Sequence, residues 1–172
     1  MRTIYIMSGI PGSGKSTYVS KYAGRDHIIL PRDRFRDQLR ELYKSEEYYP
    51  VPAPEEYEMW ADHIKKTLKD NPRRNIWIDQ CTPTQRSAEK LLKAISPAFL
   101  ADDFVCFTVI HTTLDQCLKR NALREGFEEI PPSVIRNIHN SQLKDPLQMD
   151  ALMRLYPDRR FYIAHTNEME AV

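Results

Sequence analysis

At 172 residues, the chain has the length of one domain with a sizeable core, and its 41% hydrophobic and 28% charged residues are ordinary for a globular protein. No apolar run approaches the roughly 20 residues of a membrane span, and the N-terminus lacks a signal-peptide pattern, so we expect no membrane partner. The formal net charge of +1 excludes a strongly basic protein, and an anionic partner such as nucleic acid therefore needs local basic patches.

Predicted elements alternate between short apolar strands and helices along the whole chain. The strands are predicted at residues 3–8, 27–30, 75–79, 104–110 and 160–164. The helices are predicted at 15–23, 33–43, 55–69, 84–95, 114–125 and 131–144, with a short one after 146. This alternation indicates an α/β fold, a parallel sheet of about five strands with helices on both faces. We expect a single domain over 1–172, in which 146–172 supplies a C-terminal helix and strand.

Apolar spacing also predicts which side chains of two helices face the core. For the helix at 33–43 these are Phe35, Leu39 and Leu42, and for the helix at 55–69 they are Met59, Ile64 and Leu68.

Cysteine and histidine usage limits the possible site chemistry. Cys81, Cys106 and Cys117 are odd in number and form no C-x-x-C pair, which predicts a reducing, cytoplasmic setting without a disulfide framework or zinc site. The five histidines are scattered and show no His-Glu-x-x-His spacing.

The first predicted strand runs directly into GIPGSGKST, which matches G-x-x-x-x-G-K-[ST] and precedes a predicted helix. Glycines let successive backbone N–H groups curl around an anion, and the helix N-terminus adds partial positive charge. We therefore expect this loop to bind the phosphates of ATP or GTP. The expected binding residues are Gly9, Pro11, Gly12, Ser13, Gly14, Lys15, Ser16 and Thr17.

Two side chains of this loop have specific expected roles. Lys15 should reach the β- and γ-phosphates and act in catalysis, and the Ser16 hydroxyl should bind Mg²⁺. The loop alone does not say whether the phosphate goes to water or to an acceptor.

The segment after the second strand carries Arg32, Asp33 and Arg36. In an open parallel sheet, ligands lie outside the carboxyl ends of the strands, where this segment falls. Asp33 is placed to accept the proton of an attacking hydroxyl, and Arg36, with Arg32 beside it, could hold an anionic acceptor. In the alternative interpretation, Asp33 only caps the helix and the arginines are solvated.

Asp79 ends the strand NIWID, at the position of a Walker B carboxylate. Such a carboxylate orients the Mg²⁺ shell, directly or through water, or the substrate. The alternative is a simple turn residue at a strand end.

Arg120 and Arg124 are four residues apart and should share one helix face, with Gly126 ending the helix. With the following GFEEIPP they predict a mobile lid at about 120–132, whose arginines stabilise charge on the transferring phosphoryl group. A solvated basic face is the alternative.

Two weaker patterns allow contact with nucleic acid. The loop Tyr48-Tyr49-Pro50 and Trp60 could stack on a base, although packing is the favoured role. A basic run could follow a nucleic-acid backbone, although a solvated helix face is the favoured interpretation. It consists of Lys65, Lys66, Lys69, Arg73 and Arg74.

Residues from Ile4 to about Leu143 resemble, in order, the kinase domain of phage-type polynucleotide 5′-hydroxyl kinases. The resemblance lies in GIPGSGKST, the Arg32-Asp33-x-x-Arg36 pattern, Asp79 and the segment LKRNALREGFEEIPPSVI. It implies a P-loop kinase core like that of adenylate kinase and Mg²⁺-dependent transfer of the ATP γ-phosphate to a hydroxyl. It further implies Asp33 as general base, Arg36 on the acceptor's phosphate and the paired arginines in the lid.

The resemblance also places Asp79 at the acceptor site, where the chain departs from the family. The family usually has Asp-x-Thr-Asn after this strand, whereas this chain has Asp79-Gln80-Cys81-Thr82.

The leading hypothesis is a kinase that uses ATP and Mg²⁺ to phosphorylate nucleic acid, most simply the 5′-OH end of DNA or RNA. A close variant phosphorylates a hydroxymethyl group on a modified base in DNA, as in phage DNA modification. Two alternatives stay open: a small-molecule kinase for a nucleoside, sugar or nucleotide-sugar, and a non-catalytic NTP-binding module. The sequence does not predict an oligomeric state.

Overall fold

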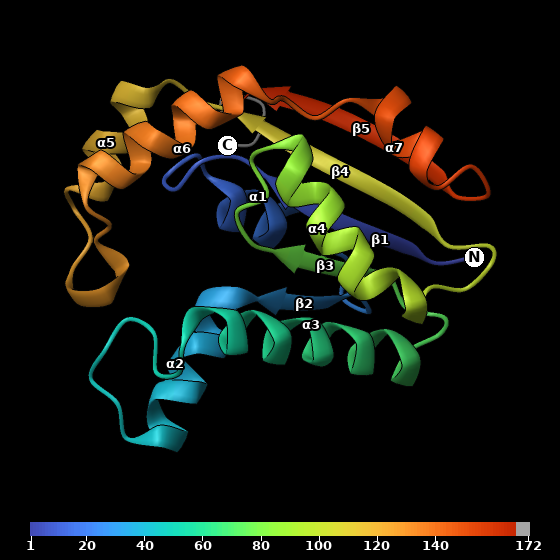
Figure 1. Cartoon of the computed structure of the whole chain (residues 1–172), viewed down its shortest axis with the longest axis horizontal. Coiled ribbons are helices and arrows are strands. Elements are labelled where there is room, and N and C mark those ends of the chain that lie inside the picture. Colours follow the sequence, from blue (N-terminus) through green and yellow to red (C-terminus); the bar gives the residue numbers. More distant parts are fainter. Residues whose placement is uncertain (168–172) are drawn as a thin grey trace.

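The computed structural model describes residues 1–167, and their strands form one sheet. The strand order is β2-β3-β1-β4-β5, and every neighbouring pair is parallel (Figure 1). The strands are β1 (Thr3–Ser8), β2 (Ile28–Pro31), β3 (Ile76–Asp79), β4 (Phe104–His111) and β5 (Arg160–Asn167). The predicted five-stranded parallel sheet is therefore confirmed.

Helices connect the strands and cover both faces of the sheet. They are α1 (Lys15–Tyr22), α2 (Arg32–Tyr43), α3 (Ala53–Asp70), α4 (Gln85–Ile95), α5 (Leu114–Asn121), α6 (Pro132–Lys144) and α7 (Met149–Leu155), with single turns η1 (Ser96–Ala98) and η2 (Gly126–Glu128). Among the described residues, no helix is both long and apolar enough to span a membrane.

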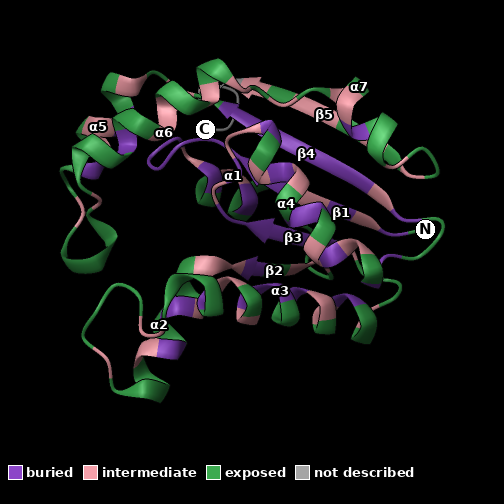
Figure 2. Cartoon of the chain, viewed as in Figure 1, coloured by how far each residue is buried: buried purple, intermediate pink, exposed green. Residues whose placement is uncertain are grey.

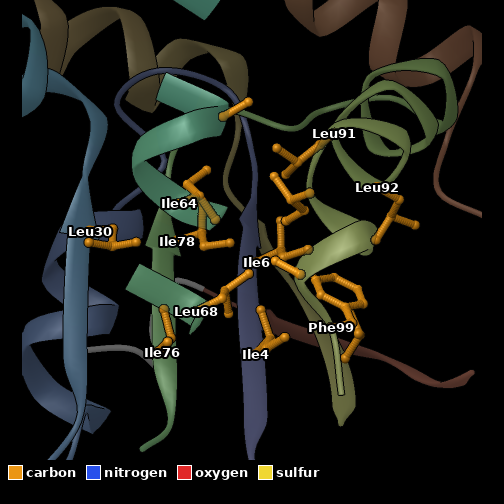
Figure 3. Packing of buried hydrophobic residues seen from close by; sticks show 14 of the residues in the cluster. Ile4, Ile6, Leu30, Ile64, Leu68, Ile76, Ile78, Leu91, Leu92 and Phe99 are labelled. Atoms are coloured by element: carbon orange, nitrogen blue, oxygen red, sulfur yellow. The ribbon is translucent and has the colours of Figure 1, made fainter. Parts of the chain in front are cut away.

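The core follows from the alternation of side chains along the central strand β1. Ile4 and Ile6 point to the face covered by α3 and α4, where they pack with Ile64 and Leu91 (Figure 3). Met7 belongs to the other face and packs with Val19 of α1. Because both faces are covered, buried residues concentrate on β1, β3 and β4 (Figure 2).

Two predicted core positions are wrong. Leu42 is 71% exposed at the end of α2, beyond the part of the helix that reaches the sheet. Met59 is only half-buried, because the stripe of α3 that faces the core runs through Glu56, Trp60, Ile64 and Leu68. Trp60 is fully buried, so packing, not base stacking, is its role.

The helix before the predicted lid is shorter than expected. It ends at Asn121, not at Gly126, because the Asn121 side chain bonds both backbone groups of Ile130: its amide donates to the carbonyl at 2.6 Å, and its oxygen accepts the N–H at 2.9 Å. This pairing closes the segment between them into a loop. Arg124 lies in that loop, so the prediction that it shares a helix face with Arg120 is wrong.

The C-terminal helix and strand are present as α7 and β5, and β5 continues to Asn167. The last five residues of the predicted segment 146–172 lie outside the described residues.

Candidate active site

A cleft of about 950 Å³ lies where the carboxyl ends of the strands meet. Its walls come from the loop before α1, the start of α2, the loop between α2 and α3, the end of β3, and the segment from α5 to α6. Most of the predicted site residues line it: Pro11, Gly12, Gly14, Lys15, Ser16, Thr17, Arg32, Asp33, Arg36, Asp79, Arg120 and Arg124. A volume of this size is at the upper end of the usual range for small-molecule sites.

The loop before α1 has the backbone shape that its glycines predict. Gly12 and Gly14 have φ angles of 83° and 98°, and a Cβ on Gly12 would lie 2.8 Å from the Cys117 carbonyl oxygen of α5. Only glycine fits there without strain. The loop therefore opens the N-terminus of α1 toward the cleft as an anion site.

Lys15 is buried beside this loop, where its Nζ donates to the Ile10 carbonyl at 2.9 Å and lies 3.5 Å from the Ser13 hydroxyl. Gly9 and Ser13, which were predicted to bind nucleotide, do not line the cleft, and Ser13 is 1% exposed. The Ser13 backbone N–H donates to the Ile10 carbonyl, which closes the turn under the loop.

The side chains of Ser16 and Asp79 lie next to each other in the wall of the cleft. The Ser16 hydroxyl donates to Asp79 Oδ2 at 2.7 Å. Burial raises the pKa of Asp79 above its ordinary value, while the Ser16 hydrogen bond and the Lys15 charge oppose that rise. Within the described residues, no group of three or more His, Cys, Asp or Glu side chains could hold a metal. The hydroxyl and single carboxylate suit Mg²⁺, which takes few protein ligands and keeps water and phosphate oxygens.

Asp33 lies in the first turn of α2 with its side chain 91% exposed in the cleft. It makes no N-cap hydrogen bond, since Pro31 occupies the N-cap and no side chain caps this helix. Its carboxylate is 3.7 Å from Arg36 Nη1. A solvent-accessible carboxylate at this point can accept a proton from a bound hydroxyl.

The sequence analysis missed Glu56 of α3, a fully buried carboxylate that holds both arginines of α2. Glu56 Oε2 accepts from Arg32 Nη2 at 2.8 Å, and Oε1 accepts from Arg36 Nε at 3.1 Å. The available signal was an acidic residue on the stripe that continues through Trp60 and Ile64. Since buried carboxylates are rare unless paired, that position should have suggested a cationic partner.

Two aromatic side chains from the loop between α2 and α3 cover Arg36. The Tyr48 hydroxyl accepts from Arg36 Nη1 at 2.8 Å. The guanidinium carbon lies 5.0 Å from the centre of the Tyr48 ring and 5.3 Å from that of Tyr49. Burial raises the pKa of Tyr48, and the Arg36 charge opposes that rise. The tyrosine loop is therefore part of the cleft wall.

Gln80, at the point where the chain departs from the family pattern, is buried and already engaged. Its oxygen accepts from the Trp60 indole N–H at 2.5 Å, and its amide donates to the Thr82 hydroxyl at 3.0 Å. Cys81 beside it is partly exposed and lines the cleft.

The two predicted lid arginines both line the cleft, and Arg120 contacts the phosphate loop. Arg120, on the last turn of α5, donates from Nη1 to the Gly12 carbonyl at 3.1 Å. Arg124, in the loop after α5, has its Nη1 3.5 Å from the Glu128 carbonyl. Both line the cleft, so the two cations converge there without sharing a helix face.

Comparison with known proteins finds a protein family whose sequence model covers most of this chain. The sequence model of a family described as an AAA domain matches residues 4–145. A search of curated proteins finds no match to this chain. Together with the parallel sheet and the loop GIPGSGKST, the family match establishes the P-loop kinase fold.

Solved structures share this fold at low sequence identity. A gluconokinase from Sinorhizobium meliloti 1021 is 17% identical, with a TM-score of 0.53 over 99% of this chain and 86% of that one. A sugar kinase from Janibacter sp. HTCC2649 is 15% identical, with a TM-score of 0.55 over 96% and 85%. A Pnkp1/Rnl/Hen1 complex is 21% identical, with a TM-score of 0.51 over 69% of this chain and 38% of that one.

Proposed function

Because the chain belongs to the AAA domain family, we propose that it is an ATP-dependent kinase that transfers the γ-phosphate to a hydroxyl of nucleic acid, most simply the 5′-OH end of DNA or RNA. The observation that supports transfer to an acceptor, not to water, is the position of Asp33. Its exposed carboxylate faces the same cleft as the phosphate loop, with two arginines fixed beside it.

The donor half of the cleft binds and polarises the phosphates. Backbone N–H groups of the loop and the start of α1 hold the β- and γ-phosphate oxygens, and Lys15 supplies a positive charge next to them. Mg²⁺, when bound at Ser16 with Asp79 beside it, neutralises phosphate charge. Arg120 and Arg124 add positive charge where it increases during transfer.

The acceptor half orients the hydroxyl and removes its proton. Asp33 accepts that proton as the oxygen attacks the γ-phosphorus, so the proton moves to the carboxylate and the bridging oxygen stays on ADP. Arg32 and Arg36, aligned by Glu56, hold a phosphate of the acceptor strand. This arrangement favours an anionic acceptor over a neutral one.

A small-molecule acceptor is the second candidate, and one observation favours it. The gluconokinase and the sugar kinase cover nearly all of this chain, whereas the Pnkp1 complex covers 69%. A hydroxymethyl group on a base in DNA, as in phage DNA modification, is a third acceptor that the same cleft chemistry serves. A non-catalytic NTP-binding module would have no use for Asp33 in the cleft.

Transfer of labelled γ-phosphate from ATP to a panel of acceptors tests the proposal. The panel contains 5′-OH DNA and RNA oligonucleotides, hydroxymethylated duplex DNA, nucleosides, gluconate and nucleotide-sugars. Label on the oligonucleotide ends supports the proposal. Label on gluconate or a nucleoside alone would replace it with the small-molecule kinase.

Two variants test the assigned roles. Asp33→Asn should lower kcat about 10²- to 10⁴-fold, because the proton acceptor is lost, while ATP affinity stays near that of the wild type. Lys15→Ala should weaken both ATP binding and transfer. Titration of ATP into each variant separates the two effects. An Asp33→Asn variant with most of its activity would show that Asp33 is not the base.

A further inference from the structure

Aromatic side chains are exposed on one wall of the cleft. Tyr48 and Tyr49, in the loop between α2 and α3, are 36% and 41% exposed. Their rings lie edge to face, with centroids 4.8 Å apart and planes at 86°. Both rings line the cleft, so part of their surface is open to a ligand.

The opposite wall is apolar and comes from the lid segment. Phe127 in η2 and Val134 in α6 are 43% and 41% exposed, and both line the same cleft. Figure 1 shows the loop between α2 and α3 and the lid segment on the same side of the molecule, facing each other. Large apolar side chains left open in a concave site indicate a ligand surface.

Arg40 shows how close the two walls are. Its guanidinium carbon lies 4.4 Å from the centre of the Phe127 ring, and its Nη1 donates to the Tyr48 carbonyl at 3.0 Å. One arginine side chain therefore spans from the tyrosine loop to the lid. The tyrosine loop and the lid are therefore neighbouring walls of one cleft, and both can contact a ligand bound in it.

A cationic group, the guanidinium of Arg36, lies directly beside this aromatic surface. Arg36 packs against both tyrosine rings and forms an ion pair with the buried Glu56. A ligand that binds both the aromatic surface and the Arg36 guanidinium carries a planar ring next to an anionic group. A nucleotide has both, whereas a sugar acid has the anion without the ring.

We propose that Tyr48, Tyr49 and Phe127 form an aromatic clamp that stacks on the base next to the reacting hydroxyl of the acceptor. The proposal rests on the proposed function and adds that the base itself, not only the phosphate backbone, determines which acceptors bind. Stacking tolerates every base because each has a planar face. The clamp therefore selects for the presence of a base without selecting its identity.

The test compares two 5′-OH oligonucleotides that differ only in whether the first nucleotide carries a base or a stable abasic residue. For the wild type, we expect the abasic acceptor to have a KM about 5- to 150-fold higher, as loss of one stacked base predicts. Tyr49→Ala and Phe127→Ala should raise KM for the normal acceptor toward the abasic value and leave KM for ATP unchanged. Tyr49→Phe, which keeps the ring, should restore discrimination between the two acceptors.

Tyr43→Ala is the matched control, because Tyr43 is 51% exposed at the end of α2 and does not line the cleft. It should retain the full preference for the base. Equal KM values for the two acceptors in the wild type would overturn the clamp while leaving the proposed function intact. The clamp would also be overturned if Tyr49→Ala raised the KM values of the normal and the abasic acceptor by the same factor. If no oligonucleotide is phosphorylated, the proposed function fails and the clamp fails with it.

Discussion

Replacement of Glu56 by Gln keeps the volume of the side chain and removes its charge, so it tests the buried network without opening a cavity. In the wild type, the fully buried carboxylate accepts from Arg32 at 2.8 Å and from Arg36 at 3.1 Å. In Glu56→Gln, the amide oxygen can still accept from one arginine, but the NH₂ group faces a donor of the other, and both guanidiniums lose their buried counter-charge. Loss of acceptor alignment and loss of stability should therefore appear together.

The stability cost follows from the burial of the three groups. Breaking a buried ion pair by removing one partner costs about 3–5 kcal/mol. The side chains of Arg32 and Arg36 are 17% and 10% exposed, so water reaches both, and the lower end of about 3 kcal/mol applies. For a protein of this size, that corresponds to a decrease in Tm of about 6–12 °C. Such a loss is a large fraction of an ordinary folding free energy of about 5–15 kcal/mol.

Thermal and urea unfolding followed by circular dichroism measure the stability, and the kinase assay measures KM for acceptor and ATP separately. We expect a higher KM for the acceptor with KM for ATP unchanged. Glu58→Gln, an exposed position on the same helix, is the control and should change stability by less than about 0.5 kcal/mol. A loss below about 1 kcal/mol in Glu56→Gln, or an unchanged KM for the acceptor, would refute the reasoning.

Two further changes test the phosphate loop and the far edge of the sheet. Gly12→Ala should destabilise the protein by about 1–3 kcal/mol and weaken ATP binding, because the new Cβ would lie 2.8 Å from the Cys117 carbonyl oxygen at a φ of 83°. Thermal unfolding measures the stability and ATP titration measures the binding. An unchanged Tm would contradict the close approach. Burial, and to a smaller extent the neighbouring His165, lower the pKa of His111 below its ordinary value of 6.5. As the pH falls below about 6.5, the unfolded chain therefore binds more protons than the folded one, and the folded state loses stability. His111→Gln should therefore show a smaller decrease in Tm between pH 7 and 5 than the wild type, and an equal decrease would assign the pH dependence to other groups.

The strands and the backbone shape of the phosphate loop could be predicted from the sequence because their signals are local. The predicted strand 3–8 matches the observed one, and the others differ by a few residues at their ends. GIPGSGKST combines the motif with its strand-loop-helix context in nine consecutive residues, and the structure shows the positive φ angles that its glycines allow. Local periodicity and local backbone geometry suffice for these features.

The proposed acceptor half depends on contacts that no local pattern contains. Glu56 is 20 or more residues away in sequence from the two arginines that it binds. Tyr48 contacts Arg36 from a loop whose path no local sequence pattern predicts. The end of α5 was mispredicted for the same reason, because Asn121 pairs with Ile130 across the lid loop. A helix-forming sequence up to Gly126 is thus overridden by a side-chain contact with the backbone.

Under the proposed function, acceptor recognition explains the buried network of Glu56, Arg32 and Arg36 better than stability does. A buried ion pair gains little over an apolar cluster of the same volume, so stability alone does not account for two arginines on one carboxylate. Glu56 binds Arg36 through Nε and Arg32 mainly through Nη2, which fixes the direction of each planar guanidinium at the cleft wall. Arginine has five N–H donors in a rigid fork, so fixing one edge orients the others for a bidentate anion. If the network serves recognition, Arg36→Lys, which keeps the charge but loses the fork, should raise KM for phosphate-bearing acceptors while leaving KM for ATP unchanged. Normal acceptor kinetics in Arg36→Lys would show that the positive charge alone suffices.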